Sequence, residues 1–118
     1  MPRGADPEDA DLFAANWIPV LRSAVGELSW LLSRGYSEAS ALALVGNRHE
    51  LRKRQRDAVR RCACGDAALA ARIAKRVEPP LPSRALAIDG FNVLITLESA
   101  LAGAPVFRGR DGLLRDVA

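Results

Sequence analysis

The sequence predicts an α+β protein that is mainly α-helical, in which a helical module precedes the first strand and helix of an α/β domain. Apolar residues recur at spacings of three and four between Ile18 and Leu32, which is typical of a helix with one buried face. Prolines cluster in residues 79–83, where neither a helix nor a central strand can continue. The short apolar run Leu86-Ala-Ile, which ends at Asp89-Gly90, is typical of a buried parallel strand that turns into a helix.

The helical module is expected over residues 16–78 and contains about four helices. Their predicted ranges are 17–34, 37–45, 48–62 and 67–77. Gly35 and the pair Gly46-Asn47 favour helix ends, because these residues tolerate a left-handed backbone, and Ser37 is a typical N-cap. Trp30 lies off the apolar stripe and marks either a second packed face or a contact surface. Residues 1–15, with clustered prolines and acids, are predicted to form a flexible acidic leader.

The second part of the chain follows a stiff Pro-rich linker at 79–83 and occupies residues 84–118. A strand is expected at 85–88, a helix at 91–102, an extended stretch at 106–108 and the start of a further helix at 113–117. An unpaired strand edge at 85–88 favours self-association.

Positive charge is concentrated in the third predicted helix. The net charge is +3, but residues 48–61 hold seven Arg or Lys against two acids, which is +5 locally and leaves −2 elsewhere. One face of this helix, expected to pack inward, is made of Leu51, Gln55, Ala58, Val59 and Cys62. On the other side, Arg52, Lys53, Arg56 and Arg60 are predicted to contact the phosphates of RNA or another nucleic acid. The alternative is a solvated helix surface, and the helix pair 37–61 also has the spacing of a helix-turn-helix.

Several function classes find no support in the sequence. No apolar run reaches the roughly 18 residues that span a bilayer, and the amino terminus lacks a signal peptide's apolar segment, so a cytoplasmic protein without a membrane partner is expected. Cys62 and Cys64 are predicted to be reduced thiols, because even with His49 they leave a zinc tetrahedron incomplete. No phosphate-binding loop, dinucleotide-binding glycine pattern or serine nucleophile motif occurs.

Acidic residues near the predicted strand ends are the candidates for metal chemistry. Mg²⁺ prefers carboxylate oxygens, and Asp89 stands where the predicted strand ends. Asn92 lies about one turn further on, while Asp111 and Asp116 are candidates to approach the same edge. The other interpretation of Asp-Gly-Phe-Asn is a turn with an Asx-type hydrogen bond and a helix cap.

A set of longer segments carries a family resemblance. They are Arg34-Gly-Tyr, Leu44-Val-Gly-Asn-Arg, Ile88-Asp-Gly-Phe-Asn-Val-Leu-Ile-Thr and Asp111-Gly-Leu-Leu-Arg-Asp. Across roughly residues 30–117 the sequence resembles the prokaryotic family called domain of unknown function 434. The resemblance implies that the chain continues into a Rossmann-like domain similar to the PIN and NYN nucleases. Asp89 and Asn92 match the opening motif of their acidic magnesium site, and Asp116 matches a later acid.

This resemblance implies one part of a metal-dependent ribonuclease with an incomplete active site. Asp89 and Asp116 are the predicted catalytic residues, and Asp89, Asn92, Asp111 and Asp116 are the predicted ligands of Mg²⁺ or Mn²⁺. The later strands and acids of such a nuclease are absent from these residues, which predicts a truncated chain, a homodimer or a complementing C-terminal domain. The alternative is a non-catalytic module that binds nucleic acid or another partner through the basic helix.

Overall fold

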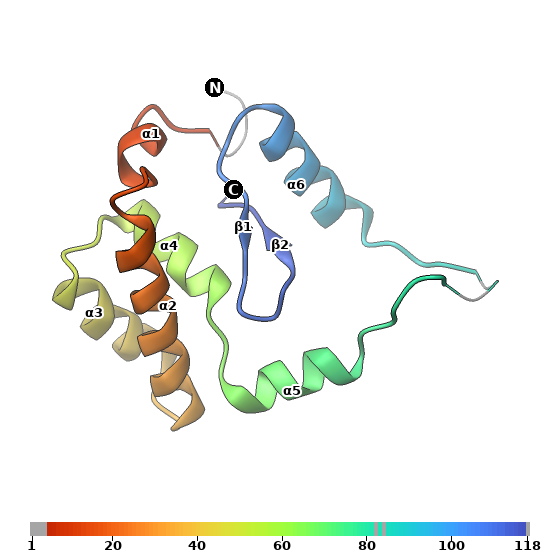
Figure 1. The fold of residues 1–118 in the computed structure, drawn as a ribbon, viewed down its shortest axis with the longest axis horizontal. Coiled ribbons are helices and arrows are strands. Elements are labelled where there is room, and N and C mark those ends of the chain that lie inside the picture. The colour runs from red at the N-terminus through yellow and green to blue at the C-terminus, as the bar shows by residue number, and fades with distance from the viewer. Residues whose placement is uncertain (1–4, 82, 84, 118) are drawn as a thin grey trace.

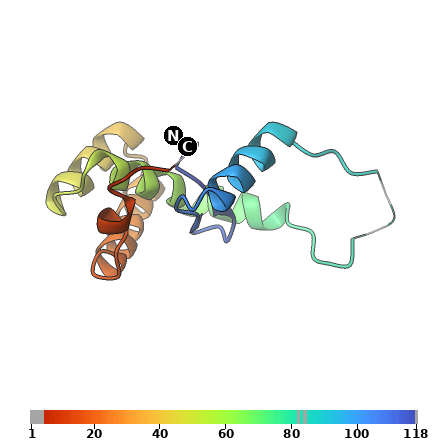
Figure 2. The same ribbon diagram turned by 90° about the horizontal axis from the view of Figure 1, so that it is seen from above.

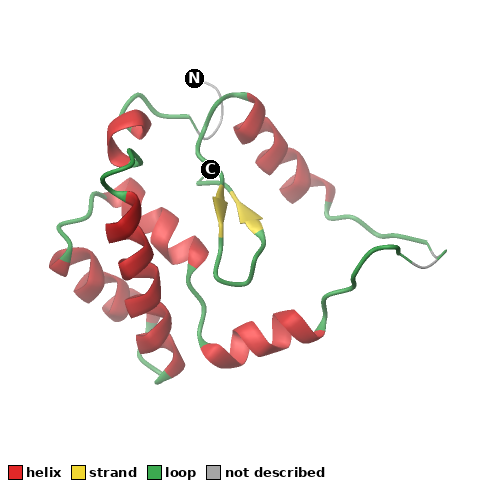
Figure 3. Ribbon diagram, viewed as in Figure 1, coloured by secondary structure: helices red, strands yellow, loops and turns green. Residues whose placement is uncertain are grey.

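The structure is a computed structural model that describes residues 5–81, 83 and 85–117. The described elements are α1 (Asp9–Leu12), α2 (Ile18–Ser33), α3 (Glu38–Arg48), α4 (Lys53–Cys62), α5 (Asp66–Ala74), α6 (Gly90–Leu101), β1 (Phe107–Arg108) and β2 (Leu114–Arg115) (Figure 1). The chain is therefore α+β and mainly helical, as predicted, with one small sheet (Figure 3). Parts of the predicted leader, linker and last segment fall on residues 1–4, 82, 84 and 118, outside the described residues.

Helices α2, α3 and α4 form a bundle that contains the core. Helix α2 contacts both α3 and α4, and the buried cluster draws on all three helices and their connections. Its members are Leu21, Ala24, Leu28, Ala41, Val45, Leu51, Val59 and Ala63. The predicted 17–34 helix is confirmed within one residue at each end, and Gly35 takes the expected positive φ of 86° after it. Regular apolar spacing gave a correct prediction here because one side of α2 packs against two neighbouring helices, with Leu21 and Leu28 buried.

The second predicted helix begins as expected but ends later. The amide of Ser40 donates to Ser37 Oγ at 3.3 Å, which confirms the N-cap. The predicted end at Gly46-Asn47 is wrong, because α3 continues to Arg48 and Gly46 is buried inside it. A Cβ on Gly46 would stand 2.6 Å from the guanidinium of Arg56, so this glycine allows a close approach rather than a turn. The left-handed residue is instead Glu50, with φ of 53°.

The basic helix is shorter than predicted, since α4 begins at Lys53 rather than Arg48. Arg52 is its N-cap, and the backbone amide of Arg52 donates to Gln55 Oε1 at 2.9 Å. The five residues of its predicted inner face are all buried. Gln55 is fully buried, but both ends of its side-chain amide are hydrogen-bonded, because its Nε2 donates to the carbonyl of Leu12 at 2.8 Å.

The predicted flexible leader is ordered where it meets α4. Residues 9–12 form α1, and Asp9 forms an ion pair with Arg54. This pairing raises the pKa of Arg54, chiefly through the side-chain hydrogen bond to Asp9. Leu12 is buried. The ring centroids of Phe13 and of Phe107 on β1 lie 5.0 Å apart. These contacts depend on residues far along the chain, so local composition could not predict them.

Two predicted elements in the second part are wrong. Residues 85–88 form no strand, since no described strand lies beside them to complete a ladder. The helix predicted to start at 113–117 is instead β2, which pairs antiparallel with β1 so that Phe107 faces Arg115. The extended stretch at 106–108 and the helix at 91–102 are confirmed as β1 and α6, with α6 at Gly90–Leu101. Helix α5 ends at Ala74, three residues earlier than predicted.

The hairpin of β1 and β2 lies between α4 and α6 (Figure 1). The amide of Arg110 donates to the carbonyl of Cys62 at 2.8 Å, which fastens the hairpin to the end of α4. Seen from above, the bundle occupies one end of the molecule, and the described residues between α5 and α6, 75–81, 83 and 85–89, project from the other (Figure 2). The hairpin is therefore fixed to the end of the basic helix.

Candidate nucleic-acid interface and acidic site

The cations of α4 divide into bound and exposed groups. Arg56 bends back, and its Nε donates to the carbonyl of Leu51 at 2.8 Å while Nη2 donates to Asn47 Oδ1 at 3.1 Å. Arg56 was predicted to point outward, but these bonds hold it against α3. Arg52, Lys53 and Arg60 are exposed, and we call these three residues the basic face. Lys53 pairs with Asp57 at 3.0 Å, an exposed helical pair that contributes little to stability.

The start of α6 and the end of β2 meet at a small hollow. Its volume is about 250 Å³, and its lining includes Asn92 and Thr96 from α6, Asp116 after β2, and Arg61 from α4. Thr96 Oγ1 donates to Asp116 Oδ2 at 2.8 Å, and Arg61 Nη1 lies 3.8 Å from Asp116 Oδ1. Asp116 is buried. The structure thus brings the predicted residues Asn92 and Asp116 to one place.

Asp89 joins this group through Asn92. Asp89 is the exposed N-cap of α6, and Asn92 Nδ2 donates to its Oδ2 at 2.5 Å. The Asx-type bond to the backbone and the side-chain helix cap, which the sequence offered as an alternative, are not formed at Asp89. The bond between the two side chains instead orients the Asp89 carboxylate. Since Asn92 donates through nitrogen, its amide oxygen remains available as an acceptor.

Asp111 belongs to a different arrangement. Its side chain is only 1% exposed; Arg115 donates to both of its oxygens at 2.7 Å, and Arg72 donates at 3.0 Å. The hydrogen bonds from Arg115 hold the pKa of Asp111 far below its usual range, although burial opposes them. Asp111 therefore closes the β1–β2 turn, where its Oδ1 also accepts the amide of Leu113 at 3.1 Å.

The described His, Cys, Asp and Glu side chains limit the kinds of metal site that the chain can form. Among the residues that the structure describes, no group of three or more His, Cys, Asp and Glu side chains could hold a metal ion. Cys62 and Cys64 are free and buried, and burial raises the pKa of the Cys62 thiol. Any oxygen site must therefore combine carboxylates with an amide or backbone oxygen.

Sequence reasoning missed part of the hollow. Thr96 was not singled out, although it follows Asn92 by four residues and so shares its helix face. Arg61 and Arg115, which also line the hollow, were not singled out either. The 92–96 spacing was a usable signal, whereas the approach of α4 and β2 depends on the tertiary structure.

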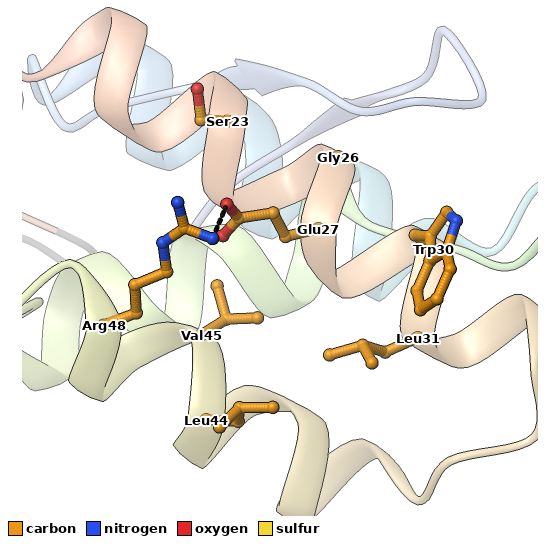
Figure 4. Close-up of a pocket in the computed structure, with 8 residues that line it drawn as sticks. All are labelled: Ser23, Gly26, Glu27, Trp30, Leu31, Leu44, Val45 and Arg48. Atoms are coloured by element: carbon orange, nitrogen blue, oxygen red, sulfur yellow. Dashed lines mark ion pairs between the residues drawn. The ribbon is translucent and has the colours of Figure 1, made fainter.

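A second hollow, an apolar groove, lies between α2 and α3 (Figure 4). Leu31, Leu44 and Val45 line it, and Glu27 pairs with Arg48 across it at 3.0 Å. Trp30 at its edge is 54% exposed, with the Arg34 guanidinium 3.6 Å from its ring centre. Trp30 is thus on a surface, and among the described residues nothing packs over it as a second buried face would require.

Comparisons with known proteins find family matches in both parts of the chain, and the description of neither family names an activity. Residues 20–75 match the model described as "Protein of unknown function (DUF434)", and residues 80–118 match "Domain of unknown function (DUF5616)". An uncharacterized protein of Methanocaldococcus jannaschii is 32% identical over 99 residues, which cover 81% of this chain and 47% of that protein. The chain thus spans about half the length of this relative.

No solved structure matches the chain. None of the described helices is long and apolar enough to cross a bilayer. The single resemblance expected over residues 30–117 divides into two family matches, whose boundary falls near the Pro-rich linker. The predicted resemblance to domain of unknown function 434 is therefore supported for the helical module, residues 20–75, and a second family of unknown function matches residues 80–118.

Proposed function

We propose that this chain carries part of a metal-dependent ribonuclease site, in which Asp89, Asn92 and Asp116 hold Mg²⁺ or Mn²⁺ and the basic face holds the RNA backbone. The observation that carries the proposal is the hollow shared by Asn92, Thr96 and Asp116 with Arg61 of the basic helix. It joins Asp116 to the cationic helix, because Arg61 Nη1 lies 3.8 Å from Asp116 Oδ1.

The donor atoms present fit a hard cation. Two carboxylates and an amide oxygen are the ligand types that Mg²⁺ and Mn²⁺ prefer. Asp111 does not fit, because Arg115 and Arg72 occupy its oxygens, so we remove it from the proposed ligand set. Asp89 and Asp116 would hold the ion with Asn92, and Thr96 orients Asp116. When bound, such an ion polarises a phosphate and activates water.

An arginine of the hollow complements these acids. Arg61 lines the hollow, where a phosphate would be bound by charge-assisted hydrogen bonds, whereas the guanidinium of Arg115 is held by Asp111. Arg52, Lys53 and Arg60 continue the positive potential along α4. The relative is about twice as long as the match, so further acids of a complete site would come from outside these residues.

The metal site is tested by titrating isotope-labelled protein with Mn²⁺ and following amide NMR signals. The paramagnetic ion is expected to broaden the signals of residues 89–92 and of Asp116 before others, because broadening falls steeply with distance. The double variant Asp89→Asn and Asp116→Asn should lose this selectivity. Asp66→Asn, at an exposed aspartate paired with Arg110, is the matched control and should retain it. Equal broadening in the double variant would contradict the proposed site.

The basic face is tested by charge reversal. Arg52→Glu with Arg60→Glu should weaken binding of a short single-stranded RNA and lower the salt dependence of log Kd by about 1.4, or roughly 0.7 for each lost phosphate contact. Fluorescence anisotropy at several salt concentrations, with EDTA present, measures both. The control Arg22→Glu with Lys75→Glu changes the net charge equally at other exposed positions, and it should leave the slope unchanged.

A non-catalytic nucleic-acid-binding module is the second candidate, because the basic face exists independently of the acids. The two experiments separate the candidates. RNA binding that depends on Arg52 and Arg60, together with no selective Mn²⁺ effect at Asp89 and Asp116, would favour the binding module. If the basic-face variant and its control weakened RNA binding equally, both candidate functions would be contradicted.

A further inference from the structure

Helix α6 turns its polar side toward its own protein and its apolar side toward solvent. Asn92 and Thr96 line the hollow beside β2, and Ser99 on the same side is fully buried. Ser99 Oγ has no hydrogen-bond partner among the described residues. A surface helix normally has the reverse arrangement, with its apolar stripe facing the core. The orientation of α6 therefore indicates that its outward side is covered by something else.

The solvent-facing side of α6 and the residues just before it form a large exposed apolar surface. We define the outer face as Leu86, Ile88, Phe91, Leu94, Leu97 and Leu101, which are between 52% and 89% exposed. On α6 its members follow one another at spacings of three and four, and Leu86 and Ile88 precede them with the alternate spacing of one strand side. Together these residues expose on the order of 800 Å², more than the roughly 300–600 Å² of the largest apolar patch on a typical monomer.

We propose that the outer face is a dimer interface between two copies of this chain. The exposed area agrees with the roughly 800 Å² that each partner buries in a standard protein interface. Between residues 85 and 97 the only charged side chain is Asp89, so pairing the face with itself brings few like charges together. A two-fold axis makes the same patch complementary to itself.

The backbone of residues 85–88 supplies a second reason for this partner. No backbone hydrogen bond joins these residues to another part of the chain that the structure describes. Their sequence is typical of a strand, and an unpaired strand readily adds another of its kind. Two copies related by a two-fold axis can pair residues 85–88 antiparallel, while the α6 stripes cover each other. This dimer provides the strand partner that one copy lacks.

The dimer is independent of the proposed nuclease site. Asn92 and Thr96 lie on the opposite side of α6 from Leu94 and Leu97, so the hollow stays open when the outer face is covered. Failure of the metal or RNA experiments would leave the dimer unaffected, and a monomeric chain would leave the hollow unaffected.

Sedimentation equilibrium of the 118-residue chain tests the proposal over roughly 1–200 μM, a range that covers moderate protein affinities. The chain is expected to show a monomer–dimer equilibrium. Leu94→Glu should be monomeric throughout, because the two-fold axis brings two buried carboxylates together. Its fold should persist, since Leu94 is exposed and Glu is a good helix former, and circular dichroism at 222 nm checks this.

Leu44→Glu on α3 is the matched control, because Leu44 and Leu94 are both 63% exposed. It should dimerise like the unmodified chain. A monomeric unmodified chain would overturn the proposal and leave the outer face to a segment of a longer protein. Equal dimerisation of Leu94→Glu, loss of dimers in Leu44→Glu, or open-ended assembly would each overturn it as well.

Discussion

Leu28→Ala is expected to lower the free energy of unfolding by about 2–5 kcal/mol, the usual range for a leucine truncated in a packed core. Leu28 is 0% exposed and lies in the cluster shared by α2, α3 and α4. Truncation removes contacts with all sides of the bundle and leaves a cavity that the surrounding helices fill only in part. Urea denaturation followed by circular dichroism at 222 nm measures the change.

Leu44→Ala is the matched control for this prediction. Leu44 is on α3 at the apolar groove and is 63% exposed, so the same substitution should change the free energy of unfolding by less than about 0.5 kcal/mol. If the two variants lost similar stability, α2 would not be the centre of the core.

Asp111→Asn is expected to release the β1–β2 hairpin from α5. The substitution keeps the shape of the side chain but removes the charge that Arg115 and Arg72 share. The loss should lie near the lower end of the roughly 3–5 kcal/mol typical of a broken buried ion pair, because the Arg72 side chain is 44% exposed and regains water. Amide hydrogen exchange should show faster exchange at Gly109 and Leu113, whose backbones close the turn.

The same aspartate predicts an acid-dependent loss of stability. Its pKa is lowered in the folded state, so its contribution is fully present above the unfolded-state pKa of about 4. That contribution is lost progressively as the pH falls below this value toward the folded-state pKa. The stability difference between the natural chain and Asp111→Asn should therefore be constant near neutral pH and shrink below about pH 4.

Asp66→Asn provides the comparison for both effects. Asp66 also pairs with an arginine, Arg110, but its side chain is 73% exposed. Solvent screens such a pair, so its loss should change stability and hydrogen exchange little. Equal effects of the two substitutions would mean that Asp111 is not the residue that fastens the hairpin.

The sites show where sequence reasoning reached its limit. The sequence selected Asp89, Asn92 and Asp116, and the structure brings Asn92 and Asp116 to one hollow. The sequence prediction also grouped Asp111 with these residues, because the position of an acid in the chain does not show which Arg or Lys it pairs with. Arg56 was assigned to the outer side of α4 for a similar reason, since its guanidinium is held by atoms of Leu51 and Asn47.

The sequence by itself determined the features that depend on near neighbours. The stripe of α2, the Ser37 cap and the buried face of α4 follow from helical spacing and local hydrogen bonds, so they could be predicted. Tertiary structure alone decided the length of α3, the order in residues 9–12 and the strand at 114–115. Each requires contact with another segment, because a ladder, a partly buried ion pair or a close approach at glycine forms only when separate segments meet.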